Sequence, residues 1–139
     1  MKVELEQKLI AKFPKIFSQP NFGFEISDGW YQIIESLCFS IQSYIDWKNN
    51  QRTRFLKDNP QDLDIPKEIP QVTVEQIKEK FGGLRFYYVG GDDRIIGMVT
   101  MAEYWAANTC EYCGKPGERR QVGWIKTLCD EHHNERNKQ

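Results

Sequence analysis

The sequence has almost no net charge, few histidines and no long hydrophobic run. Its 139 residues include 19 basic and 20 acidic side chains, which leaves a net charge of −1. This balance argues against a protein that holds nucleic acid through bulk positive charge, although it permits a local basic patch. No apolar run approaches the roughly 20 residues that a membrane span requires, and the charged N-terminal residues do not resemble a signal peptide. We therefore expect a cytoplasmic protein without a membrane partner.

Familiar catalytic patterns are also missing. The chain has no Ser-His-Asp arrangement, no glycine-rich loop that would cradle phosphate, and no His-Glu-x-x-His motif. Both histidines, His132 and His133, lie close to the C-terminal end. These absences favour a binding protein over an enzyme.

Hydrophobic residues make up 40% of the chain and aromatic residues 13%, which is enough to build one compact core. Apolar residues recur at helical spacing over residues 2–13, over 28–47 with an extension toward 56, and over 94–108. Ser27 or Asp28 is expected to cap the long helix. Gly97 weakens the prediction of the last helix, and a start delayed to Thr100 is the alternative. The predicted fold class is α+β, with helices packed on a small antiparallel sheet or hairpin.

Residues 72–81 fit two structures. Thr73 and Gln76 have the spacing of a capping box, which would open a short helix. Alternatively, residues 72–79 form a strand that turns at Gly82 and Gly83 and pairs with residues 84–89, which are rich in strand formers. We favour the hairpin.

The C-terminal segment carries a metal-ligand pattern. Cys110 and Cys113 are separated by two residues, as are Cys129 and His132, and fifteen residues lie between the pairs. This spacing is typical of structural zinc sites, in which four protein ligands complete a tetrahedron. His133 is the competing fourth ligand; we favour His132 because it repeats the spacing of the first pair.

A turn at Cys110–Cys113, a hairpin over residues 118–127 and a helix from Cys129 would form a treble-clef-like module. We therefore predict a core domain at 1–108 and a module that holds Zn²⁺ at 109–139.

Zinc-stabilised HNH nucleases need a catalytic histidine between the ligand pairs, and residues 114–128 contain none. A zinc hydrolase would need an open metal position and a base, for which Glu131 is the adjacent candidate.

Two basic surfaces are candidates for partner or nucleic-acid contact. One lies at the far end of the long helix and the other on the predicted hairpin, where basic and aromatic residues interleave as they do in proteins that stack on single-stranded bases. The helix pattern is equally typical of a solvated helix face, and the hairpin pattern is more typical of a half-buried strand. The residues are Lys48, Arg52, Arg54 and Lys57 on the helix, and Lys78, Lys80, Arg85 and Tyr87 on the hairpin.

Three strings together resemble a family of small bacterial proteins that also occur in phages and prophages. They are GFEISDGW at 23–30, QIKEKFGGLRFY at 76–87, and the closing CxxCG, GW and LCDEH motifs within 110–132. The resemblance covers most of residues 22–133. It implies a compact unit with an attached zinc module, and it carries no activity and no catalytic residues.

Taken together, these features predict a non-enzymatic, zinc-stabilised protein that engages a host protein or ribonucleoprotein. An inhibitor of a CRISPR effector or another defence system is one concrete form. Direct binding of DNA or RNA is the alternative, and a zinc hydrolase or nuclease is the weakest candidate.

Overall fold

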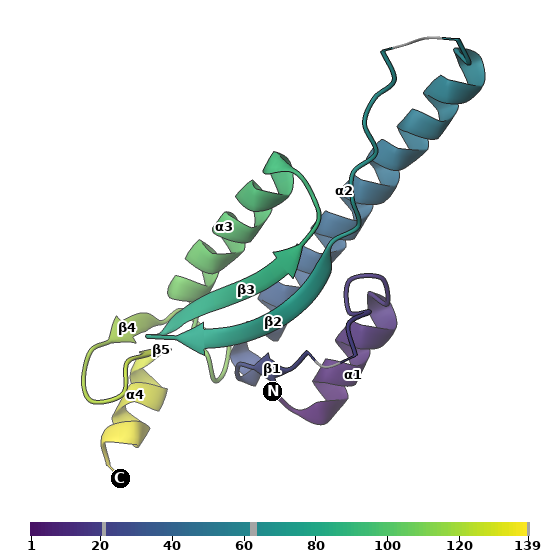
Figure 1. Ribbon diagram of the computed structural model, residues 1–139. Helices are drawn as coiled ribbons and strands as arrows, with labels where there is room; N and C mark the ends of the chain where they lie inside the picture. The colour runs from purple at the N-terminus through teal and green to yellow at the C-terminus, as the bar shows by residue number, and fades with distance from the viewer. Residues whose placement is uncertain (21, 62–63, 139) are drawn as a thin grey trace.

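The computed structural model describes residues 1–20, 22–61 and 64–138, and it has an α+β fold (Figure 1). The helices are α1 (Val3–Lys12), the short 3-10 helix η1 (Asp28–Trp30), α2 (Tyr31–Asp58), α3 (Asp93–Ala107) and α4 (Asp130–Asn137). The strands are β1 (Phe24–Glu25), β2 (Thr73–Lys80), β3 (Gly83–Val89), β4 (Glu118–Arg120) and β5 (Lys126–Leu128).

The hairpin interpretation of residues 72–81 is confirmed. Strands β2 and β3 pair antiparallel, with Ile77 opposite Phe86 and Lys78 opposite Arg85. The sheet is nevertheless mixed, because β1 joins β2 in parallel with Phe24 opposite Ile77. A two-residue strand has no periodicity from which a distant partner can be predicted, so the sequence pattern indicated only the antiparallel part.

The main core lies between the sheet and the helices. One stripe of α2, from Ile33 to Ile45, is buried at helical spacing, and alternate residues of β2 and β3, such as Ile77 and Phe86, face the same core. Helix α3 packs against both α2 and β3. Cys38 is fully buried in this core, where burial raises the pKa of its thiol.

The C-terminal half of α2 projects beyond the sheet, and the chain after it runs back along the helix (Figure 1). Asn49 fixes this return, because its side-chain amide donates to the Ile69 carbonyl at 3.1 Å and its oxygen accepts from the Ile69 amide at 2.9 Å. Although α2 is long, no helix among the described residues is both long and apolar enough to cross a bilayer.

The expected cap of α2 is wrong. Helix α2 continues directly from η1, and neither Ser27 nor Asp28 makes a side-chain capping bond to it. Asp28 instead accepts a hydrogen bond from the Lys2 amide at 2.8 Å, and the Ser27 hydroxyl donates to Glu111 at 3.2 Å. Both side chains are therefore used to join distant segments rather than to start the helix.

Helix α3 has nearly the extent that periodicity predicts, 94–108, and the delayed start considered as an alternative is wrong. It begins at Asp93, so Gly97 lies inside the helix and does not delay the start to Thr100. The Asp92 carboxylate caps the helix by accepting from the amides of Arg94 and Ile95. Such a cap contributes about 1 kcal/mol, which offsets the similar cost of an internal glycine.

Replacing Gly97 with alanine is expected to stabilise the protein by about 1 kcal/mol, because a Cβ there meets nothing within 4 Å and alanine loses less backbone entropy in a helix. Urea unfolding measures the change. Gly91→Ala is the matched contrast, since Gly91 has a φ of +79 and lies beside Ile95, and we expect it to destabilise. Equal effects of the two substitutions would contradict this account of α3.

Candidate metal centre

The first ligand pair lies on a tight turn after α3. The Gly114 amide donates to the Cys110 carbonyl at 2.9 Å, and the Cys110 amide donates to the Lys115 carbonyl at 2.7 Å. Gly114 has a φ of +81, a conformation that residues with a side chain rarely adopt. The turn therefore curls the backbone so that both thiols point to the same side.

The second pair lies at the start of α4. Strands β4 and β5 form an antiparallel hairpin with Arg119 opposite Thr127, and this hairpin returns the chain to the first pair. Cys129 is the N-cap of α4, and its sulfur accepts from the His132 amide at 3.5 Å. Because His132 is three residues further on, the two side chains share one face of the helix.

The four side chains converge. One ligand atom from each of Cys110, Cys113, Cys129 and His132 lies within 4.8 Å of all the others. The Cys113 and Cys129 sulfurs are 3.8 Å apart, and the Cys110 and Cys129 sulfurs lie 3.6 and 3.3 Å from His132 Nδ1. The four residues can thus bind a metal ion, with Nδ1 as the histidine donor.

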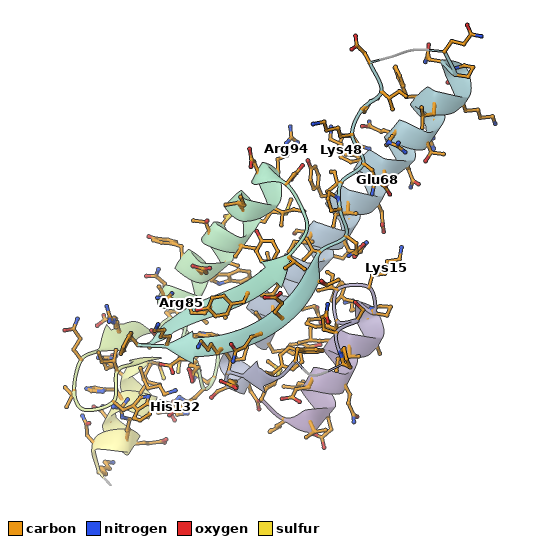
Figure 2. The ribbon with its side chains drawn as sticks, viewed as in Figure 1. Lys15, Lys48, Glu68, Arg85, Arg94 and His132 are labelled. Carbon is orange, nitrogen blue, oxygen red and sulfur yellow. The ribbon has the colours of Figure 1, made fainter. Side chains whose placement is uncertain are left out.

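His133 is not part of this group. Its ring nitrogen Nε2 lies 3.3 Å from the Asn137 side-chain amide, whereas His132 packs edge-on against Tyr112 with ring centroids 5.5 Å apart. Figure 2 shows His132 beside α4, far from the labelled side chains Arg94, at the start of α3, and Lys48, on α2. The geometry therefore supports His132, rather than His133, as the fourth ligand.

All three cysteines of the site are free thiols. Burial raises the pKa of Cys110, but hydrogen bonds from nearby backbone amides outweigh it and leave the pKa below its ordinary value. The pKa of Cys113 is raised by burial and by the neighbouring thiols Cys110 and Cys129. Crowded thiols resist joint ionisation, and a bound cation relieves that resistance.

A buried carboxylate lies next to the site. Glu111 is only 1% exposed, and the Lys126 ammonium contacts its two oxygens at 2.9 and 3.4 Å. Lys126 also lies 3.5 Å from Glu79 of β2. Burial alone would lower the pKa of Lys126, but the hydrogen bond and charge of Glu111, helped by Glu79, raise it overall. This group was not predicted from sequence, since its members are far apart in the chain.

Backbone contacts join the site to the main core. The Gly29 amide donates to the Glu111 carbonyl at 2.7 Å, and the buried Trp30 indole donates to the Thr109 carbonyl at 2.9 Å. On the other side, the Thr127 hydroxyl donates to the Gly82 carbonyl at 2.7 Å. The division into 1–108 and 109–139 stays a prediction, and these contacts show that the second part is firmly attached.

The structure places the two predicted basic surfaces apart from each other (Figure 2), and Lys80 of the hairpin set lines a hollow with Gly123, Trp124 and Ile125 of the C-terminal segment. Lys78, Arg85 and Tyr87 share the sheet face opposite Ile77 and Phe86, and Lys80 follows at the hairpin turn. The Lys78 ammonium lies 5.6 Å from the centre of the Tyr87 ring. The other set, on the projecting half of α2, comprises Lys48, Arg52, Arg54 and Lys57.

Comparison with protein-family models, with curated proteins and with solved structures finds no match to this chain. Function therefore has to follow from the side chains described above.

Proposed function

We propose that the four-ligand site holds Zn²⁺ and that the protein is a non-enzymatic binding protein built around this clamp. Zn–S and Zn–N bonds of about 2.3 and 2.0 Å give tetrahedral edges of about 3.8 Å between sulfurs and about 3.5 Å between sulfur and nitrogen. The separations of 3.8, 3.6 and 3.3 Å support a metal of this size. Three thiolates and one imidazole are also a donor set that suits zinc.

The arrangement around the ligands supports a treble-clef module with a structural role. A cysteine turn, the β4–β5 hairpin and α4 follow one another in that order. Four protein ligands fill the tetrahedron and leave no position for a reactive water. Glu131, the base that a hydrolase would need, instead forms an ion pair with Lys115 at 3.8 Å.

The observation that carries the binding role is the uncharged outer face of α3. Within residues 95–108, Glu103 is the single charged side chain. Met101 and Tyr104 are 75% and 74% exposed, although the opposite face, with Val99 and Ala102, is buried in the core. A helix that is apolar on both faces is normally covered on both.

This face borders a groove between α2 and α3, which we call the α2–α3 groove. Its volume is about 420 Å³, and it is lined on one side by Ile33 and Leu37 and on the other by Met98, Met101 and Trp105. Its polar lining, Ser36, Ser40 and Asn108, is uncharged. A groove between two helices with such a lining suits the apolar face of an amphipathic helix.

We therefore propose that the groove binds an amphipathic helix of a host protein. That protein is either a separate protein or a component of a ribonucleoprotein. Exposed methionine and aromatic side chains supply much of the energy at such interfaces. In line with the resemblance to phage and prophage proteins, inhibition of a CRISPR effector or another defence system is the concrete form we propose. Direct nucleic-acid binding is the second candidate, and a basic hollow on α2, described below, favours it.

Met101→Glu is expected to lower recovery of the partner at least tenfold, because it places a charge in an uncharged groove at a cost of several kcal/mol. Tagged wild-type and variant chains are used to capture host proteins, which are compared by quantitative mass spectrometry. Val3→Glu is the matched control, since Val3 is an exposed apolar residue of α1 outside the groove.

The proposal requires a protein whose recovery depends on Met101 and not on Val3, and which binds again when purified. Light scattering of the isolated chain gives a separate outcome. If wild type is a dimer and Met101→Glu a monomer, the groove is covered by a second copy and the assignment to a host helix is wrong.

A further inference from the structure

A second hollow lies far from the metal site, and we call it the basic hollow. It is enclosed by the middle of α2, by the returning segment around residues 66–69, and by Asp92 at the start of α3. Its volume is about 670 Å³. The Arg52 Nε donates to the Pro66 carbonyl at 3.0 Å, so one wall is held against the other.

The lining of the basic hollow is strongly positive. Four basic side chains line it, namely Lys48, Arg52, Arg54 and Lys67, against the single carboxylate of Asp92. Within the described part of the chain, no ion pair joins any of these four to a carboxylate. The Arg94 guanidinium lies 5.8 Å from the centre of the Tyr44 ring and adds a further cation at the rim, and Glu68, labelled near Lys48 in Figure 2, is not among the residues that line the hollow. The hollow is therefore cationic although the whole chain is nearly neutral.

The one carboxylate offsets only one of these four positive charges. Asp92 accepts a hydrogen bond from the Tyr44 hydroxyl at 2.6 Å and from the Arg94 amide at 3.1 Å. Both bonds commit it to capping α3 and to holding Tyr44. A ligand that brings its own negative charge would be drawn to the remaining space.

The walls between the cations are aromatic. Tyr44 and Phe55 line the hollow from α2, and the adjacent Trp47 is 53% exposed with the Lys48 ammonium 5.2 Å from its ring. Cations along a groove beside aromatic rings form the pattern that binds single-stranded nucleic acid, because phosphates meet the cations and bases stack on the rings. An acidic peptide would also use the cations, but it has no bases to stack on the rings.

The spacing of the cations fits a chain of phosphates rather than one anion. Lys48 and Arg52 are four residues apart on one helix, which separates them by about 6 Å along its axis. Lys67 faces them from the returning segment. The hollow has the volume of a ligand larger than a single phosphate.

We propose that the basic hollow binds the backbone of single-stranded nucleic acid, with one or two bases stacked on its aromatic wall and little sequence preference. The site is independent of the α2–α3 groove. With about three phosphates neutralised, the salt slope for a single strand is about −2, so raising salt from 50 to 200 mM would weaken binding roughly 20-fold.

The test measures binding of a fluorescein-labelled 12-residue oligothymidylate to the zinc-loaded full chain by fluorescence anisotropy. Joint Lys48→Ala and Lys67→Ala substitution is expected to weaken binding at least tenfold and to flatten the salt slope by about 1.4. Neither side chain donates a hydrogen bond within the described residues, so thermal unfolding should be unchanged. Joint Lys8→Ala and Lys138→Ala substitution removes the same charge elsewhere and should leave binding intact.

Three results would overturn the proposal. The first is wild-type affinity in the Lys48 and Lys67 double variant. The second is a loss of binding on joint Lys78→Ala and Lys80→Ala substitution alone, which would move the contact to the hairpin. The third is competition by polyglutamate or by a 12-base-pair duplex that is as effective as competition by the unlabelled single strand. That result would mean that the hollow attracts any polyanion and does not stack bases.

Discussion

Removal of the metal with a chelator is expected to unfold residues 109–137 and leave the main core folded. The second buried cluster consists only of Cys110, Leu128 and Cys129, so apolar burial alone cannot hold this part of the chain. Binding of structural zinc supplies about 10 kcal/mol or more. Hydrogen exchange followed by mass spectrometry should show protection lost over β4, β5 and α4 but kept in α2 and β2. Full protection of all segments in metal-free protein would disprove the clamp.

The two adjacent histidines provide the matched pair for this experiment. His132→Ala removes a ligand, and we expect less than a tenth of the wild-type zinc content at limiting zinc, together with the same loss of protection. His133→Ala should keep one zinc per chain, because His133 contacts Asn137 and lies outside the ligand group. Zinc content is read by elemental analysis of the purified chains. Equal zinc loss in both variants would mean that the ligand assignment is wrong.

Gly29→Ala is expected to lower the free energy of unfolding by about 3 kcal/mol. A Cβ at Gly29 would lie 2.2 Å from the Cys110 carbonyl oxygen and 2.5 Å from that of Glu111. Both are backbone atoms, so the turn that carries the first ligand pair must move away from η1. That movement strains the packing and breaks the hydrogen bond from the Gly29 amide to Glu111. Urea unfolding with zinc in excess measures the loss.

Gly23→Ala is the control for this substitution. A Cβ at Gly23 meets nothing within 4 Å, and the stability should change by less than about 0.5 kcal/mol. The zinc content of the Gly29 variant shows whether stability is lost through weaker packing of the turn on the core or through loss of the metal. We expect the variant to keep its zinc and to lose stability, because only the contact between the ligand turn and the core is weakened. Wild-type stability in Gly29→Ala would show that the close approach is not needed.

Features that depend on local spacing could be predicted from the sequence. Within each ligand pair, the two residues are three positions apart. One turn and one helix are therefore enough to direct the side chains toward a common point, and the structure brings together the four predicted side chains. The α2 stripe and the β2–β3 hairpin follow from periods of 3.6 and 2 in the same way. Whether zinc is the bound metal stays a prediction.

Features that depend on distant contacts could not be predicted. Ser27 and Asp28 have the composition of a helix cap, but their side chains are taken by Glu111 and by the Lys2 amide. Lys67 was missed as a member of the basic hollow because nothing in its neighbourhood indicates that the chain turns back toward Lys48. Burial of Glu111 depends likewise on Lys126, on the far side of the β4–β5 hairpin.

The contacts that attach the metal site to Gly29 and Trp30 also set an order of events during folding. The metal ligands are at most 22 residues apart, whereas the Trp30 indole and the Thr109 carbonyl are separated by 79. Closing the longer loop costs more entropy and contributes most to a slow rate. The ligand turn can therefore form early, but the buried indole gains its acceptor only when residues 30 and 109 meet. A nascent chain released before that meeting would expose the unpaired Trp30 region and depend on chaperones for protection.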